Sequence, residues 1–310
     1  MALDQIFRRN RIENNGRFMV GGNVQNVLFE AGSVKDSDVG VEVTTNGGRW
    51  ADYLDGGPTD ILARNNQFMN VSQPYFGNRL KETKIIPNLD VLNTAIVPVV
   101  NQRQGWMERN EAINQKVKSD KVDLIYIGDS IVQNFESQGK DVWDYYYRPR
   151  NGLNMGISGD RTQHVLWRLD HGNIDGISPK LAVVMIGQNN GSHNTSNEIT
   201  EGVTAVVQKL RVKLPNTKIL LLGIFQRREK PTPEREVFSV ANKNLSMLAD
   251  NNHIFYMDIN ELFLRSDGSI SSDLMPDFEH PSPLGHWIWA ERIEAKVAEL
   301  MGENPLPAMK

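Results

Sequence analysis

Five residues, carried by loops far apart in the 310-residue chain, have the side-chain types that acyl transfer from an ester requires: Ser130, Gly159, Asn189, Asp277 and His280. Acyl transfer needs a nucleophile, a base, a group that orients the base, and donors for the oxyanion. Ser130 would be the nucleophile and His280 the base. Asp277, three residues before His280, would orient the imidazole through its other ring nitrogen. The backbone N–H groups of Ser130 and Gly159 and the side-chain amide of Asn189 would form the oxyanion hole.

Each member of this set also has a purely structural interpretation. Gly128-Asp129-Ser130 is by itself typical of a turn or a helix cap, and Gly159 could be only a turn glycine. Asn189-Asn190 could cap a helix, and Asp277 with His280 could be a surface pair or part of a metal site. We favour the catalytic interpretation because the four segments around Ser130, Gly159, Asn189 and His280, called blocks below, all occur in one chain, each beyond a predicted strand. The remaining histidines lack this setting and are expected to be structural or at the surface: His164, His171, His193, His253 and His286.

The stretch around Ser130 predicts how the nucleophile is presented. Leu124–Ile127 is an apolar, partly β-branched run that predicts a buried strand. Gly128 ends the run, and Asp129 and Ser130 both suit the start of a helix. Ser130 would then lie at the carboxyl edge of a sheet, where open α/β folds bind their ligands.

Similar apolar runs alternate with helical patterns along the rest of the chain. Near-continuous apolar strands separated by helices indicate a parallel sheet covered on both faces, and therefore an α/β fold. In such a sheet the loops that carry the five residues would meet at one edge. The expected strands after Leu124–Ile127 are Gly152–Gly156, Leu181–Ile186, Lys218–Leu222 and Ile254–Met257, and the expected helices are Met107–Val117, Gln163–Leu169, Glu198–Leu214, Val237–Leu248 and Leu284–Met301.

Composition narrows the class of protein further. A net charge of −4 favours neither nucleic acid nor an anionic membrane surface as a partner. The chain has no cysteine, which excludes disulfides and thiolate chemistry. No apolar run reaches the ~18 residues of a membrane span, and the first residues lack the apolar core of a secretory signal. We therefore expect a soluble protein, cytoplasmic or carried on a phage or other particle. We see no cluster with metal-ligand spacing, and expect neither a metal nor a cofactor.

Residues 1–90 have a different character from the rest. They are rich in glycine, and Arg17–Val20, Val24–Phe29 and Val39–Val43 are short β-like runs. Asn46-Gly47-Gly48 and Asp55–Pro58 are turn signals. We expect a β-rich module or arm over 1–90, a catalytic domain over 91–303 and a tail over 304–310. The module could be a structural elaboration of the main domain, or a device for attachment or oligomerisation.

The four blocks together resemble the GDSL/SGNH hydrolases, whose Ser, Gly, Asn and His fall on Ser130, Gly159, Asn189 and His280. The segments 154–169, 226–233 and 266–270 are similar to the branch that contains the platelet-activating-factor acetylhydrolase type Ib catalytic subunits and their bacterial relatives. The similarity covers about residues 95–300, and Ile131 stands where the family name has leucine. It implies a three-layer α/β/α flavodoxin-like fold without a lid domain.

The resemblance also implies an activity. We expect a serine esterase that hydrolyses short-chain esters, acetyl esters above all, on an acetylated carbohydrate or lipid. The alternatives are a thioesterase, a polysaccharide or peptidoglycan deacetylase, or a virion- or surface-attached structural protein that carries this domain. The expected partners are the ester substrate and, through residues 1–90, copies of the same chain or a larger assembly.

Overall fold

The computed structural model describes residues 93–309 and, in the first 92 residues, the strands alone. The chain forms two compact units, residues 1–92 and residues 93–310, and each is described by itself. The strands of the first unit are β1 (Gln5–Arg8), β2 (Arg11–Glu13), β3 (Phe18–Val20), β4 (Val27–Glu30), β5 (Ser33–Val43), β6 (Ile61–Arg64), β7 (Gln67–Phe76) and β8 (Thr83–Ile86).

The strands of the first unit pair in parallel. One sheet has the order β1-β4-β6-β8, and another has β2-β5-β3 with β7 on β5. The two sheets advance together along the chain: Gln5 pairs with Val27 as Arg11 pairs with Ser33, and Leu28 pairs with Leu62 as Ser33 pairs with Gln67. Such parallel stacking of successive strands in two sheets is typical of a β-solenoid. The predicted turns at 46–48 and 55–58 lie outside the described residues.

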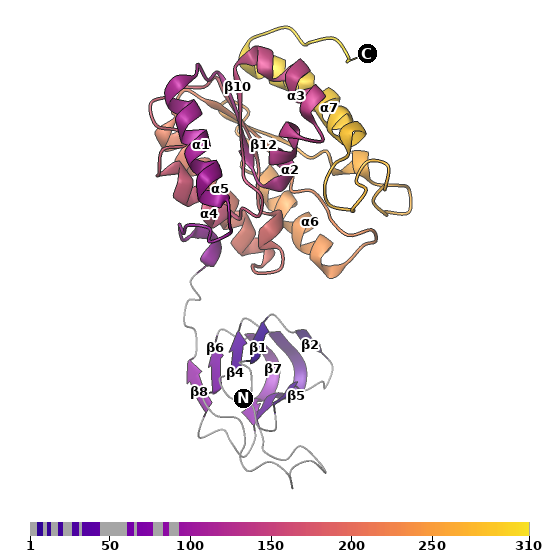
Figure 1. Ribbon diagram of the computed structural model, residues 1–310. Helices are drawn as coiled ribbons and strands as arrows, with labels where there is room; N and C mark the ends of the chain where they lie inside the picture. Colours follow the sequence, from indigo (N-terminus) through magenta and orange to yellow (C-terminus); the bar gives the residue numbers. More distant parts are fainter. Residues whose placement is uncertain are drawn as a thin grey trace. The chain divides into compact units, whose positions relative to one another are not determined.

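The second unit is built on a five-stranded parallel sheet of order β10-β9-β11-β12-β13. Its strands are β9 (Leu124–Gly128), β10 (Gly152–Gly156), β11 (Leu181–Met185), β12 (Lys218–Leu222) and β13 (Ile254–Met257). This is the strand order of flavodoxin-like folds, in which the chain reverses direction beside the first strand. The predicted α/β class is confirmed, and the strands lie within a residue of their expected bounds (Figure 1).

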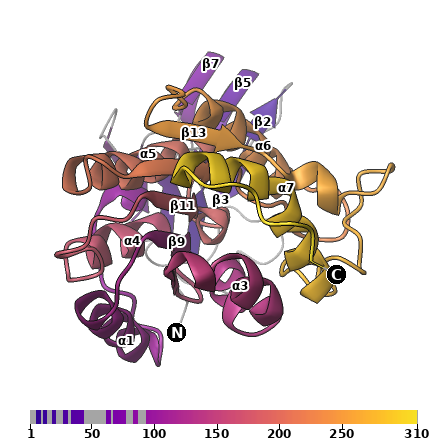
Figure 2. The ribbon, with the colours of Figure 1, turned by 90° about the horizontal axis from the view of Figure 1, so that it is seen from above.

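Helices cover both faces of this sheet because successive strand side chains point to opposite sides. Leu124 and Tyr126 of β9 join one apolar cluster, whereas Ile125 and Ile127 join the other. The Ile125 face packs on α1 (Trp106–Ser119), α4 (Thr162–Leu169), α5 (Ser196–Lys213) and α6 (Pro233–Ser246). The Tyr126 face packs on α2 (Ser130–Gln133), α3 (Lys140–Tyr146) and α7 (Pro283–Met301). Figures 1 and 2 show the sheet enclosed between these layers.

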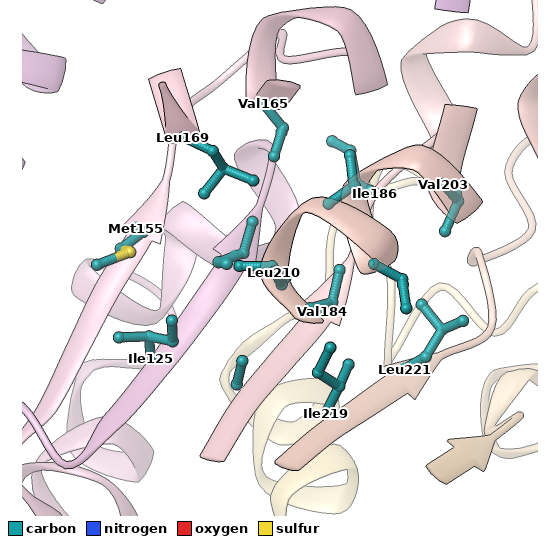
Figure 3. Packing of buried hydrophobic residues seen from close by; sticks show 14 of the residues in the cluster. Ile125, Met155, Val165, Leu169, Val184, Ile186, Val203, Leu210, Ile219 and Leu221 are labelled. Carbon is teal, nitrogen blue, oxygen red and sulfur yellow. The ribbon is translucent and has the colours of Figure 1, made fainter. Parts of the chain in front are cut away.

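The apolar cluster on the Ile125 face contains α4 and α5, the helices that follow the loops of Gly159 and Asn189. Figure 3 shows strand side chains such as Val184 and Leu221 packed against Val203 and Leu210 of α5. These side chains are essentially inaccessible to solvent. Each fully buried aliphatic side chain of this kind stabilises the fold by about 1.5–3 kcal/mol. The strand ends from which the loops leave are therefore rigidly placed.

The helix termini follow recognisable capping chemistry. Thr195 caps α5 in a capping box with Glu198, so the helix starts slightly before the predicted Glu198. Ser282 caps α7, Pro283 is its first residue, and Gly302 ends it in the left-handed conformation. The short 3-10 helices are η3 (Thr94–Ile96), η4 (Asn134–Glu136), η5 (Arg148–Arg150), η6 (Gln188–Asn190) and η7 (Asn260–Phe263). Within the described residues no helix is long and apolar enough to cross a membrane.

Helix α3 does not appear among the elements expected from the sequence. It is only seven residues long, so its buried side chains Val142, Trp143 and Tyr146 cover a single helical repeat, which is too short to predict a helix from periodicity. In the fold Trp143 makes an edge contact with Tyr126 of β9. The helix is thus stabilised by tertiary contacts with an aromatic cluster on the sheet.

Candidate active site

The turn between β9 and α2 presents Ser130 at the carboxyl edge of the sheet. A Cβ on Gly128 would lie only 2.5 Å from the carbonyl oxygen of Met185 on the neighbouring strand, so the position requires glycine. The Asp129 side chain then caps α2 by accepting the N–H of Ile131 at 3.0 Å. The strand-to-helix turn predicted for Ser130 is therefore present.

Ser130, His280 and Asp277 form a hydrogen-bonded series. Ser130 Oγ lies 2.8 Å from His280 Nε2, and His280 Nδ1 lies 2.7 Å from Asp277 Oδ2. The other carboxylate oxygen, Oδ1, accepts the backbone N–H of His280 at 2.7 Å. Burial opposes ionisation, but these bonds from His280 outweigh it and hold the pKa of Asp277 below its usual value. A charged carboxylate thus faces the imidazole nitrogen that does not face the serine.

The loop that carries His280 does not leave directly from a strand. It follows β13 only after η7 and a turn-rich stretch, and it ends where Ser282 caps α7. Phe278, between Asp277 and Glu279, has a φ of 58°. This left-handed residue tightens the turn so that one carboxylate reaches both the backbone and the ring of His280.

Gly159 lies in the loop after β10 with a φ of 78°, which favours glycine. Within residues 93–309 its N–H has no acceptor, so the group is free to donate to a ligand. The next residue anchors the loop. Asp160 accepts the indole N–H of Trp106 at 2.6 Å and the Arg168 Nε–H at 2.8 Å. Arg168 also donates to the carbonyl of Gly128 at 3.2 Å, which ties the Gly159 loop to the base of the nucleophile turn.

Asn189 lies in η6, directly after β11. Its Nδ2 donates to the carbonyl of Asp160 at 2.9 Å and to Asp129 Oδ2 at 3.2 Å. The side-chain oxygen of the neighbouring Asn190 accepts the N–H of Thr162 at 3.0 Å. This bond also holds the segment after β11 against the segment after β10. The third block is therefore in contact with both the first and the second.

The Asp129 carboxyl has an unusual environment for a capping residue. Its side chain is fully buried, and burial raises its pKa to about 7, although the hydrogen bond from Ile131 and the charge of His280 oppose the shift. The carboxyl that contacts the Asn189 amide therefore changes charge near neutral pH.

Several residues that hold the site together are not among those predicted from the sequence. Asp160, Arg168, Trp106 and Asn154 are all buried polar or aromatic side chains that link its loops. Their common signal is that three of them fall in the segment 154–169, which resembles the hydrolase family closely. Among the other histidines, burial lowers the pKa of both His164 and His286 to about 4, so both are neutral near pH 7. No group of three or more potential ligands in the described part of the chain could hold a metal ion.

The fold and the site define a class of protein. A flavodoxin-like parallel sheet with a serine, a histidine and an aspartate hydrogen-bonded in series at its carboxyl edge is the arrangement of a serine hydrolase. Residues 126–288 match the model of the GDSL-like lipase/acylhydrolase family, and the chain belongs to that family. It is thus a carboxylic ester hydrolase.

Individual relatives agree with the branch expected from the sequence. The chain is 35% identical to the platelet-activating factor acetylhydrolase IB subunit alpha2 of Rattus norvegicus over 218 residues, which are 69% of this chain and 94% of the relative. It is 33% identical to the human alpha1 subunit over 200 residues, 64% of this chain and 85% of the relative. The predicted family resemblance is confirmed.

Solved structures share the fold. One from Bacteroides fragilis, assigned as an acylhydrolase, gives a TM-score of 0.53 at 16% identity over 65% of this chain and 100% of that chain. One from Streptococcus pneumoniae gives 0.51 at 20% identity over 62% of this chain and 94% of that chain. At these identities the likeness concerns the fold alone.

Proposed function

We propose that the protein is a serine esterase that removes short acyl groups, acetyl above all, from an acetylated carbohydrate or lipid. The observation that carries the proposal is the uninterrupted series from Ser130 Oγ through the His280 ring to Asp277, with contacts of 2.8 and 2.7 Å. These distances are within the range in which a base can take the proton of a nucleophile. The curated relatives are named acetylhydrolases, which supports the acetyl preference.

The acylation step would follow from these contacts. Ser130 Oγ attacks the ester carbonyl carbon while its proton passes to His280 Nε2, and Asp277 stabilises the imidazolium that forms. The carbonyl oxygen becomes an oxyanion that accepts hydrogen bonds from the N–H groups of Ser130 and Gly159. When the tetrahedral intermediate collapses, the alcohol leaves with the proton from His280. Water then repeats the sequence on the acyl-serine and releases the acid.

Asn189 would supply the third oxyanion donor through an exchange of partners. Both of its Nδ2 protons are engaged, one by the Asp160 carbonyl at 2.9 Å and one by Asp129 at 3.2 Å. The longer contact, to Asp129, is the one that an oxyanion would replace. Asp160 would then keep the amide in place during the reaction.

The proposal is tested with 4-nitrophenyl acetate, butyrate and palmitate. We expect the acetate and butyrate to be hydrolysed far faster than the palmitate, and S130A to lose more than about 95% of the activity because the nucleophile is absent. The control is S246A, because Ser246 is an exposed residue at the end of α6. A preference for palmitate would contradict the short-acyl proposal. Substantial activity in S130A would exclude Ser130 as the nucleophile.

A further inference from the structure

Two arginines, one in contact with Gly159 and one two residues after it in the sequence, have no carboxylate partner within residues 93–309. They are Arg103, in the loop before α1, and Arg161, in the loop after Gly159. Arg103 is exposed, whereas Arg161 is half-buried, and burial without a compensating charge lowers its pKa. A half-buried guanidinium that gains no ion pair from the protein has lost hydration without compensation, which is favourable for binding an external anion.

The position of Arg103 is set by contacts with the oxyanion loop. Its Nη1 lies 2.8 Å from the point that a Cβ on Gly159 would occupy. Asn101 holds the backbone there, because its Oδ1 accepts the Arg103 N–H at 3.0 Å and its Nδ2 donates to the Gly159 carbonyl at 3.4 Å. The guanidinium therefore lies against the Cα of the glycine whose N–H is proposed to bind the oxyanion.

The other cations of this region are already neutralised. Arg168 is paired with Asp160 at 2.8 Å, and Arg109 is paired with Glu136 at 2.9 Å. His164, which contacts Asn101, is neutral near pH 7 because burial lowers its pKa to about 4. Positive charge without a carboxylate partner thus remains on Arg103, which lies against Gly159, and on Arg161, which follows Gly159 by two residues at the start of α4.

We propose that Arg103 and Arg161 bind an anionic group, a carboxylate or a phosphate, that the substrate carries beside the ester attacked by Ser130. A guanidinium presents two parallel N–H donors that match either anion. The inference rests on the proposed esterase function and adds a substrate class to it: acetyl esters of acidic molecules are preferred to acetyl esters of neutral ones.

The test compares acetyl esters that differ only in charge. The substrates are 4-acetoxybenzoate, its neutral analogue 4-acetoxybenzamide, and 4-acetoxyphenyl phosphate. They are assayed with the full-length wild type and with R103Q and R161Q. The control is R148Q, since Arg148 is also exposed but lies in η5, just before β10 begins and therefore at the opposite edge of the sheet. Thermal unfolding of each variant shows that it remains folded.

We expect the carboxylate-to-amide ratio of kcat/KM to fall about tenfold in R103Q, chiefly through KM, because a charge-assisted hydrogen bond is lost. R161Q lowers the ratio in the same direction, and R148Q leaves it within about twofold. In the wild type the ratio also falls as NaCl is raised. The phosphate substrate shows which of the two anions is preferred.

Three results would overturn the inference. An unchanged ratio in folded R103Q and R161Q would show that the arginines bind no substrate anion. If R103Q loses kcat/KM equally on the charged and the neutral ester, Arg103 supports the conformation of the Gly159 loop and does not bind a substrate anion. A wild type that hydrolyses none of the esters, nor 4-nitrophenyl acetate, would refute the esterase proposal and this inference with it, whereas turnover of the neutral esters without a charge effect refutes this inference alone.

Discussion

Replacing Arg168 with methionine tests how the loops of the site are held together. The Arg168 side chain is fully buried and pairs with the equally buried Asp160 at 2.8 Å. It also donates to Asn173 Oδ1 at 2.8 Å and to the Gly128 carbonyl. The R168M variant would keep the apolar length of the side chain but leave the Asp160 charge without its counterion.

The expected loss of unfolding free energy in R168M follows from the burial of the Arg168–Asp160 ion pair. Removing one partner of a buried ion pair destabilises a protein by about 3–5 kcal/mol, because the other charge remains desolvated. The matched control is R292M. Arg292 pairs with Glu261 at the same distance of 2.8 Å, but these side chains are 43% and 70% exposed, so its loss should cost at most about 1 kcal/mol. The double variant D160N/R168M should recover part of the stability that R168M loses.

The pH dependence gives a second signature. Burial raises the pKa of Asp160 even in the presence of Arg168, which lowers it, so removing Arg168 raises that pKa further. The folded state then binds a proton that the unfolded state, with an ordinary aspartate, releases. The unfolding free energy of R168M relative to the wild type should therefore increase as the pH falls from 8 toward 5.

The measurement is urea unfolding followed by tryptophan fluorescence at pH 8 and pH 5.5. Five of the six tryptophans follow residue 92, so the signal reports mainly on the catalytic unit. The activity of R168M should also fall, because the Gly159 loop and the Gly128 turn lose their common contact. A loss below about 1 kcal/mol at pH 8, or an equal loss at both pH values, would refute this reasoning.

Three further predictions concern other parts of the molecule. N189A should lower kcat about 100-fold or more with little change in KM, because one oxyanion donor is removed; a change confined to KM would contradict this role. The Asp129 carboxyl has a folded pKa of about 7, above its ordinary value, so its contribution to stability should decrease by up to ~4 kcal/mol as the pH rises from 4 to 7. Carbon-13 NMR of labelled aspartates should show a carboxyl that titrates near 7 and is absent from D129N; if all carboxyls titrate below 5, the assignment is wrong. A chain that starts at residue 93 should fold and keep its activity on 4-nitrophenyl acetate, because the sheet and all four loops lie in the second unit, and it should lose self-association or binding to a larger assembly. If the shortened protein is insoluble or inactive, residues 1–92 are instead required to cover part of the catalytic unit. If its mass in solution and its binding to a larger assembly are unchanged, residues 1–92 do not have the proposed role in assembly.

Local sequence patterns were sufficient to predict the strands of the catalytic unit and the placement of several site residues. The apolar run 124–127 predicts a buried strand because its length and its β-branched residues suit a sheet that is covered on both sides. Ser130 follows it at a break that also starts a helix, so the placement of the serine could be predicted from neighbouring residues alone. The same holds for Gly159 and Asn189, since each lies in a loop directly beyond a strand.

Other features were decided only by tertiary structure. Arg168 lies on an amphipathic helix, where an arginine is ordinarily solvated, and its full burial depends on Asp160, Asn173 and the end of β9 converging on it. No short-range pattern encodes that convergence. In the same way, nothing near Arg103 in the sequence indicates that its guanidinium lies against Gly159. Local propensity and periodicity depend on neighbours along the chain and therefore determine the elements, whereas the partners of buried charges depend on how distant segments pack and are set only when the sheet and its helices assemble.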